Sequence, residues 1–127
     1  MASVEERPIS VLIVEDEILI RLETAECVGQ QGFVVYEAAN ADEAIRILEN
    51  HEEIRLVFTD INMPGSMDGL KLAHYVRGRW PPVKIIITSG LVKACPEDLP
   101  SGAIFIGKPY KPESIARQFQ DLIAGAA

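Results

Sequence analysis

The chain has 127 residues, of which 48% are hydrophobic, and this is enough for one domain with a core of its own. Its net charge of −7 and its lack of basic runs argue against a nucleic-acid-binding surface. No apolar run approaches the length of a membrane span, and the first residues lack the features of a secretory signal. We therefore expect one soluble, cytoplasmic domain over residues 1–127, with its core at about 9–124.

Short apolar runs rich in β-branched residues recur along the chain, with helical stretches between them. Such runs are typical of parallel strands that are covered on both faces. We predict five strands, the second of them at an edge of the sheet: 11–14, 33–38, 56–59, 85–87 and 103–107. The alternation indicates an α/β fold, a doubly wound parallel sheet with helices on both faces.

The first helix is predicted between the first two strands and ends near Gly29. Ile18, Leu22 and Ala25 recur at spacings of four and three, and we expect them to face the core. On the same helical wheel Ile20 falls near the opposite face, so we expect an exposed isoleucine beside the first strand's end.

Three later helices carry clearer boundary signals. Asn40 followed by Glu43 has the form of an N-cap, the next helix begins near Asp68 and stops at Pro81, and Pro112 suits a first helical position. Their predicted core residues are Ala41, Ala44, Ile45 and Leu48, then Leu72, Ala73 and Val76, then Ile115, Phe119, Leu122 and Ile123. Between them, Pro96 and Pro100 predict that the remaining connection is mostly loop, so the fourth helix should be short or irregular.

Polar residues of different kinds follow four of the predicted strands: Glu15-Asp16, Asp60, Thr88-Ser89 and Lys108. In open parallel sheets, ligands bind outside the carboxyl ends of the strands. Three acids, a hydroxyl and a lysine would therefore meet in one crevice. That set suits a divalent cation together with a phosphoryl group.

The motifs at these strand ends closely resemble those of the receiver domain of bacterial two-component response regulators. They are Glu15-Asp16, Asp60-Ile61-Asn62-Met63-Pro64 before Met67-Asp68-Gly69, Thr88-Ser89-Gly90 and Lys108-Pro109-Tyr110. The resemblance covers essentially the whole chain and implies a flavodoxin-like sheet in the order 2-1-3-4-5. Because the residues after the last predicted helix are too few for an output domain, we expect a stand-alone receiver.

The resemblance implies roles for individual residues. Asp60 would accept the phosphoryl group, and Lys108 and Thr88 would contact the phosphoryl oxygens. Mg²⁺ would be held by Asp16, Asp60 and the backbone carbonyl of Asn62, with Glu15 acting directly or through water. The expected chemistry is Mg²⁺-dependent self-phosphorylation and autodephosphorylation only, rather than that of an enzyme, and a cis peptide bond is implied before Pro109.

Signalling would run through proteins, with no direct contact to nucleic acid and no insertion into a membrane. The donor would be a histidine kinase or a histidine phosphotransfer protein, and the sequence does not identify the downstream protein. We predict that Ile20, with Pro109 and Tyr110 across the site, forms the apolar centre of the kinase contact. Thr88 and Phe105 occupy the switch positions, and the coupling of Phe105 would rest on packing alone because phenylalanine lacks a hydroxyl.

Each of these residues also has an ordinary structural explanation. Asp16 and Asp60 can cap a helix or a turn, Lys108 can be a solvated charge, and Thr88 suits any strand. Their joint occurrence at four strand ends favours the receiver. A non-switching phosphate sink or an adaptor receiver remains an alternative, whereas a phosphatase of the haloacid-dehalogenase type is disfavoured because Asn62 stands where those enzymes carry a second acid.

Overall fold

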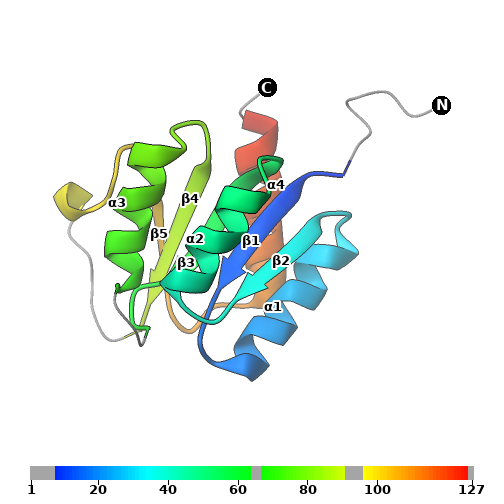
Figure 1. Ribbon diagram of the computed structural model, residues 1–127. Coiled ribbons are helices and arrows are strands. Elements are labelled where there is room, and N and C mark those ends of the chain that lie inside the picture. Colours follow the sequence, from blue (N-terminus) through cyan, green and yellow to red (C-terminus); the bar gives the residue numbers. More distant parts are fainter. Residues whose placement is uncertain (1–7, 64–66, 91–95, 126–127) are drawn as a thin grey trace.

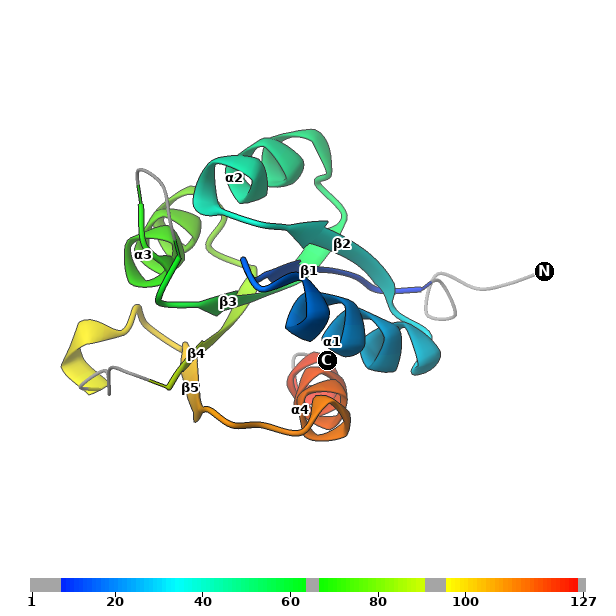
Figure 2. The ribbon, with the colours of Figure 1, turned by 90° about the horizontal axis from the view of Figure 1, so that it is seen from below.

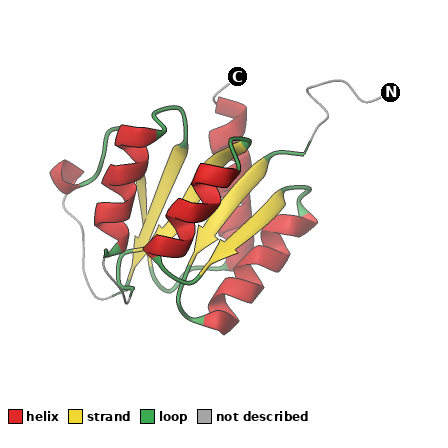
Figure 3. Cartoon of the chain, in the orientation of Figure 1, coloured by secondary structure: helices red, strands yellow, loops and turns green. Residues whose placement is uncertain are grey.

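The computed structural model describes residues 8–63, 67–90 and 96–125 (Figure 1). Five parallel strands form one sheet in the order β2-β1-β3-β4-β5, which confirms the predicted order and places β2 at an edge. The strands are β1 (Ser10–Val14), β2 (Val34–Ala38), β3 (Ile54–Asp60), β4 (Lys84–Ser89) and β5 (Ile104–Gly107). They alternate along the chain with α1 (Ile18–Gln30), α2 (Ala41–Asn50), α3 (Gly69–Arg79), the 3₁₀ turn η2 (Pro96–Asp98) and α4 (Pro112–Gly125) (Figure 3).

Helices cover both faces of the sheet, as predicted. Helices α2 and α3 lie on one face, and α1 and α4 lie on the other (Figure 2). The strand β1 shows why its apolar run is continuous, because Leu12 and Val14 belong to the core under α2 and α3 whereas Val11 and Ile13 belong to the core under α1 and α4. None of the helices that the structure describes has the length and apolar character to cross a bilayer.

The predicted boundaries of α2 and α3 are confirmed by their caps. The Asn40 side chain accepts a hydrogen bond from the Glu43 N–H, and the Glu43 carboxylate accepts one from the Ala39 N–H at 2.9 Å. Asp68 caps α3 by accepting from the Lys71 N–H. The predicted apolar residues of α2, α3 and α4 all lie in the two cores, fully or partly buried.

Helix α1 differs from the prediction. Ile18 and Leu22 are exposed rather than buried, Ala25 packs partly against the core, and the fully buried residues of the helix are Thr24 and Val28. The inward face is therefore rotated from the predicted one, and Ile20 is half-buried rather than exposed. The pattern failed because it counted apolar residues only, whereas the hydroxyl of Thr24 is paired with that of Tyr110 at 3.2 Å and can be buried without loss.

The connection between β4 and β5 is irregular, as predicted. The stretch before Pro96 lies outside the described residues, and after it the chain forms the single 3₁₀ turn η2. Two side chains of α3 hold this connection: His74 Nε2 is 2.6 Å from the Asp98 carbonyl, and Arg77 Nε donates to the Ser101 carbonyl at 2.9 Å.

Candidate functional site

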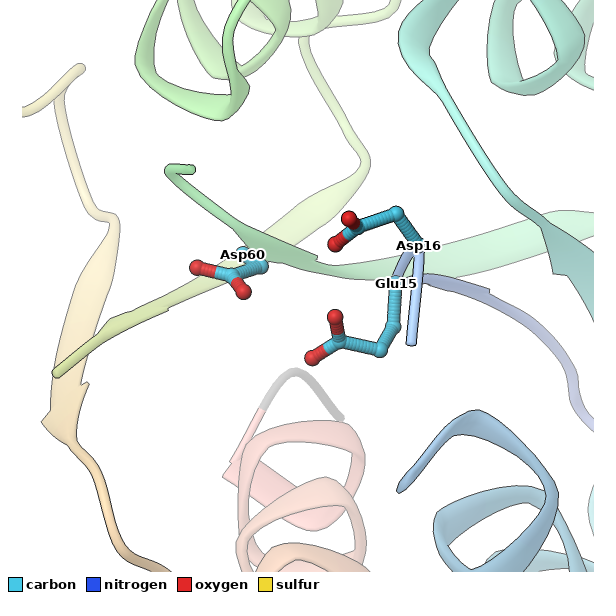
Figure 4. A group of neighbouring side chains, drawn as sticks. All are labelled: Glu15, Asp16 and Asp60. Carbon is cyan, nitrogen blue, oxygen red and sulfur yellow. The ribbon is translucent and has the colours of Figure 1, made fainter. Parts of the chain in front are cut away.

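Three carboxylates gather beyond the ends of β1 and β3. Glu15 and Asp16 follow β1, Asp60 ends β3, and each offers an oxygen atom within 4.8 Å of the others (Figure 4). Glu15 and Asp60 are buried whereas Asp16 is exposed at the rim. Oxygen ligands at this density suit a hard divalent cation, so the donor set fits the predicted Mg²⁺.

Lys108 follows β5 and reaches into this cluster. Its Nζ lies 2.7 Å from Asp60 Oδ2 and 3.1 Å from Glu15 Oε1. Burial lowers the pKa of Lys108, but the hydrogen bonds to Asp60 and Glu15 outweigh that effect and raise it above its ordinary value. One ammonium group cannot balance three carboxylates, so the site favours a further positive charge.

Burial also acts on Glu15, whose side chain is only 2% exposed. It raises the pKa of Glu15, with support from the negative charge of Asp60, although hydrogen bonds from the Glu17 N–H and Lys108 act in the opposite direction. The Glu17 N–H donates to Glu15 Oε2 at 3.1 Å. Both oxygens of the Glu15 carboxylate are therefore engaged within the protein.

Asp60 is oriented by its own strand and by the turn that follows it. Asp60 Oδ1 accepts a hydrogen bond from the Asn62 N–H at 3.1 Å, while Oδ2 faces Lys108. The Asn62 side chain donates to Ser89 Oγ at 3.2 Å, which ties this turn to β4. The role of the Asn62 carbonyl as a metal ligand stays a prediction.

Gly69 is a residue whose importance here sequence reasoning missed. A Cβ atom at this position would lie 1.7 Å from the Asp60 carbonyl oxygen. Only glycine therefore lets the start of α3 approach the strand that carries Asp60. The sequence signal was the Asp68-Gly69 pair, which we interpreted as a helix start and as part of the receiver motif, without a packing role for the glycine.

Thr88 lies beside Asp60 in the sheet, because the register pairs the two residues across β3 and β4. Its side chain is buried, and its hydroxyl has no hydrogen-bond partner within the part of the chain that the structure describes. A buried hydroxyl without a partner is unfavourable by about 1–3 kcal/mol. A ligand oxygen at the neighbouring carboxylate would remove that penalty.

The residues predicted to contact a partner come together at a cavity of about 410 Å³ next to the acidic cluster. Ile20 lines it from α1, and Pro109 and Tyr110 line it from the segment after β5. The peptide bond between Lys108 and Pro109 is cis, as the resemblance implied. The Tyr110 ring stacks edge-to-face on Phe58 with centroids 5.5 Å apart, and its burial raises the pKa of the phenol.

Phe105 lies apart from the carboxylates, in the middle of β5. The register pairs it with Ile87, and its half-buried ring packs against the core under α2 and α3. The structure thus brings together Glu15, Asp16, Asp60, Asn62, Thr88 and Lys108, whereas Phe105 contacts the core behind them.

Sequence comparison gives consistent results over most of the chain. The model of the response regulator receiver domain family matches residues 11–120. The sensor kinase CckA of Brucella abortus is 33% identical over 118 residues, which are 90% of this chain and 12% of that protein. The two-component response regulator PhoP of Pseudomonas aeruginosa is 33% identical over 116 residues, which are 88% of this chain and 50% of that protein. The chain therefore spans half or less of these curated relatives.

Structural comparison agrees with the sequence. The crystal structure of a CheY-like response regulator receiver domain protein from Methanospirillum hungatei JF-1 superposes with a TM-score of 0.83 at 27% identity. The match covers 94% of this chain and 96% of that one. The fold, the strand-end residues and the family match over residues 11–120 agree. The chain therefore belongs to the response regulator receiver domain family of two-component signalling.

Proposed function

We propose that this receiver domain accepts a phosphoryl group on Asp60 from a histidine kinase or a histidine phosphotransfer protein, and then acts through protein contacts. The observation that carries the proposal is the position of Lys108 Nζ, 2.7 Å from Asp60 Oδ2 inside a cluster of three carboxylates. A lone acid at a strand end has many roles. An acid paired with a lysine and crowded by two further acids is suited to phosphoryl transfer.

In the proposed reaction a carboxylate oxygen of Asp60 attacks the phosphorus atom of a phosphohistidine. The new O–P bond forms as the N–P bond breaks, and the electron pair of that bond stays on the imidazole. Lys108 then transfers its hydrogen bond from Asp60 to a phosphoryl oxygen. Thr88 supplies its unpartnered hydroxyl to a second phosphoryl oxygen, which explains why that hydroxyl is buried without a partner.

Receiver domains generally bind Mg²⁺ at an acidic pocket, and we propose that Asp16, Asp60, Glu15 and the Asn62 carbonyl hold it here. When bound, Mg²⁺ supplies the positive charge that offsets the crowded carboxylates and the incoming phosphoryl oxygens. Glu15, one of whose oxygens is already paired with Lys108, would contact the ion directly or through water.

The cavity beside the acidic cluster supports a docking role for Ile20, Pro109 and Tyr110. It opens next to Lys108, so an apolar side chain of the donor seated in it would bring a phosphohistidine close to Asp60. The lining also includes Glu23, which would favour a basic residue on the donor.

A phosphate sink without a switch is a second candidate. Phe105 favours it, because its ring already packs against the core and has no hydroxyl to exchange partners on turning inward. Nuclear magnetic resonance of the protein with and without phosphoramidate separates the two candidates. A switch would shift resonances of Phe105 and the surface around it, whereas a sink would confine the shifts to residues at the carboxylate cluster.

The acceptor is tested by incubation with acetyl phosphate and Mg²⁺, followed by mass spectrometric mapping of the adduct. We expect a single labelled residue, Asp60, and no labelling in Asp60→Asn or in the presence of EDTA. Asp121→Asn, at an exposed position on α4, is the matched control and should label as the unsubstituted chain does. Undiminished labelling of Asp60→Asn would refute the proposal.

The metal site is tested by calorimetric titration with Mg²⁺. Asp16→Ala should raise the dissociation constant at least about tenfold, because it removes one of few charged ligands. The fold should persist, since taking one acid from a crowded cluster relieves repulsion. An unchanged dissociation constant would show that Asp16 is not a ligand.

A further inference from the structure

Behind the acidic pair lies an arginine for which the sequence indicated no role. Arg21 is the fourth residue of α1, and its side chain is only 15% exposed. Its Nη1 donates to the backbone carbonyl of Glu15 at 2.8 Å, and its Nε donates to Glu37 Oε1 at 3.1 Å. One planar guanidinium group thus connects the end of β1, helix α1 and the edge strand β2.

These contacts complete the fixation of Glu15. Its N–H donates to the Ala38 carbonyl at 3.0 Å, its carbonyl accepts from Arg21, and its carboxylate accepts from the Glu17 N–H and Lys108. Because a peptide unit is planar, holding the Glu15 carbonyl also fixes the N–H and the Cα of Asp16. The direction in which Asp16 leaves the backbone therefore depends on Arg21.

Asp16 depends for its position on the contacts that Arg21, Ala38 and Glu17 make with the preceding residue. The residue is exposed, and it projects toward Asp60 from the short connection between β1 and α1 (Figure 4). The N-cap of α1 is Glu17, whose side chain makes no capping hydrogen bond. Helices α2 and α3 both have side-chain caps at their starts, whereas the start of α1 is held by Glu15, which accepts from the Glu17 N–H, and by Arg21 from within the helix.

We propose that Arg21 is a positioning residue for the metal site, which holds the Glu15-Asp16 turn so that its carboxylates face Asp60 before a cation arrives. This inference rests on the proposed function for the identity of the cation. Arg21 is not itself a ligand, because its guanidinium group is positively charged and has no acceptor atom for a cation. Its effect is preorganisation, since a turn that is already ordered loses less entropy on binding.

The sign of the effect makes the proposal testable. By charge alone, removing a cation near the site should strengthen the binding of Mg²⁺. Positioning predicts the reverse, and we expect Arg21→Met to raise the Mg²⁺ dissociation constant about tenfold in calorimetric titration. Arg117→Met, which removes an exposed arginine from α4, is the matched charge control and should bind as the unsubstituted chain does.

A double variant separates charge from geometry further. Arg21→Met with Glu37→Gln restores the original net charge but leaves the Glu15 carbonyl without its donor, so it should bind Mg²⁺ as weakly as Arg21→Met alone. If Arg21→Met does not fold, Arg21→Lys is the variant to use. Lysine keeps the charge but cannot make both hydrogen bonds of the planar guanidinium group, so this variant should also bind Mg²⁺ more weakly. Tighter or unchanged Mg²⁺ binding in these variants would overturn the proposal.

Hydrogen exchange without metal provides a readout independent of the cation. In Arg21→Met the amides of residues 15–17 should exchange several-fold faster, while those of β3 and β4 keep their protection. If the unsubstituted chain binds no Mg²⁺, the proposed function fails, and the positioning role is then decided by this exchange alone. Unchanged exchange at residues 15–17 would show that Arg21 does not order the turn.

Discussion

Helices α1 and α2 contact the same two strands, β1 and β2, from opposite faces of the sheet, but they place their apolar side chains in opposite ways (Figure 2). Helix α2 buries Ala41, Ala44 and Leu48 and turns its charged residues to solvent. Helix α1 leaves Ile18, Leu19 and Leu22 at 58%, 74% and 48% exposure and buries Thr24. The first distribution is explained by the core alone, and the second is not.

The difference follows from what each helix borders. Helix α2 lies over a core of aliphatic side chains, so its inward residues need only be apolar and of suitable size. Helix α1 begins at the acidic cluster, where Arg21 contacts Glu15 and Thr24 contacts Tyr110. Two of its inward positions, Arg21 and Thr24, are used for polar groups that support the site, while Ile18, Leu19 and Leu22 face outward. A helix that violates the amphipathic pattern next to a site is thus informative about that site.

The largest expected difference between the two helices is in stability. Leu48→Ala in α2 should lower the free energy of unfolding by about 2–5 kcal/mol, because it leaves a cavity in a packed core. Leu22→Ala in α1 should change it by less than about 0.5 kcal/mol, because that side chain is half in solvent. Urea denaturation of both variants measures the contrast. Equal losses would mean that the outward face of α1 is covered in the folded protein.

Phosphotransfer should show the opposite contrast. Ile20→Ala in α1 should slow phosphotransfer from the cognate kinase about tenfold, the effect of a contact of about 1–2 kcal/mol, but spare labelling by acetyl phosphate, which needs no docking surface. Ile45→Ala, at a half-buried position of α2, is the control and should leave both rates unchanged. Equal loss of both reactions in Ile20→Ala would indicate a role in the fold, and no loss would place the donor elsewhere.

The starts of the two helices provide a smaller contrast. Asn40→Ala removes the side-chain cap of α2 and should lower the free energy of unfolding by about 1 kcal/mol. Glu17→Ala at the N-cap of α1 removes no capping hydrogen bond, so it should change the free energy of unfolding by no more than a few tenths of about 1 kcal/mol. Thermal unfolding monitored by circular dichroism resolves the two variants. A larger loss for Glu17→Ala would contradict the view that α1 is anchored through Arg21.

The smallest effect concerns the buried hydroxyl of α1. Thr24→Val and Tyr110→Phe each remove one side of the 3.2 Å contact between the two hydroxyls. A double-mutant cycle should give a coupling of about 0.5–1 kcal/mol in the free energy of unfolding, the value of a partly buried neutral hydrogen bond. Strictly additive losses would show that Thr24 is buried for its size and not for its hydroxyl.

The sequence by itself determined the sheet, its helices on both faces and the residues that meet at its edge. Continuous apolar runs indicate strands that are buried on both faces. The carboxyl ends of parallel strands share one edge of the sheet whatever the details of packing. That rule predicted that Asp60 and Lys108 meet, although they are 48 residues apart in the chain. In the structure, Lys108 Nζ lies 2.7 Å from Asp60 Oδ2. Local signals such as Asn40 and Asp68 also fixed the starts of α2 and α3.

Only the tertiary structure decided which face of α1 is buried, why position 69 must be glycine and what Arg21 contacts. Each depends on an atom far along the chain or on an approach between backbones: Thr24 on Tyr110, 86 residues away, Gly69 on the Asp60 carbonyl, and Arg21 on Glu37. Hydrophobic periodicity counts apolar side chains and carries no record of which polar group will find a partner. Burial of a polar residue is decided by that partner, and therefore only by the folded chain.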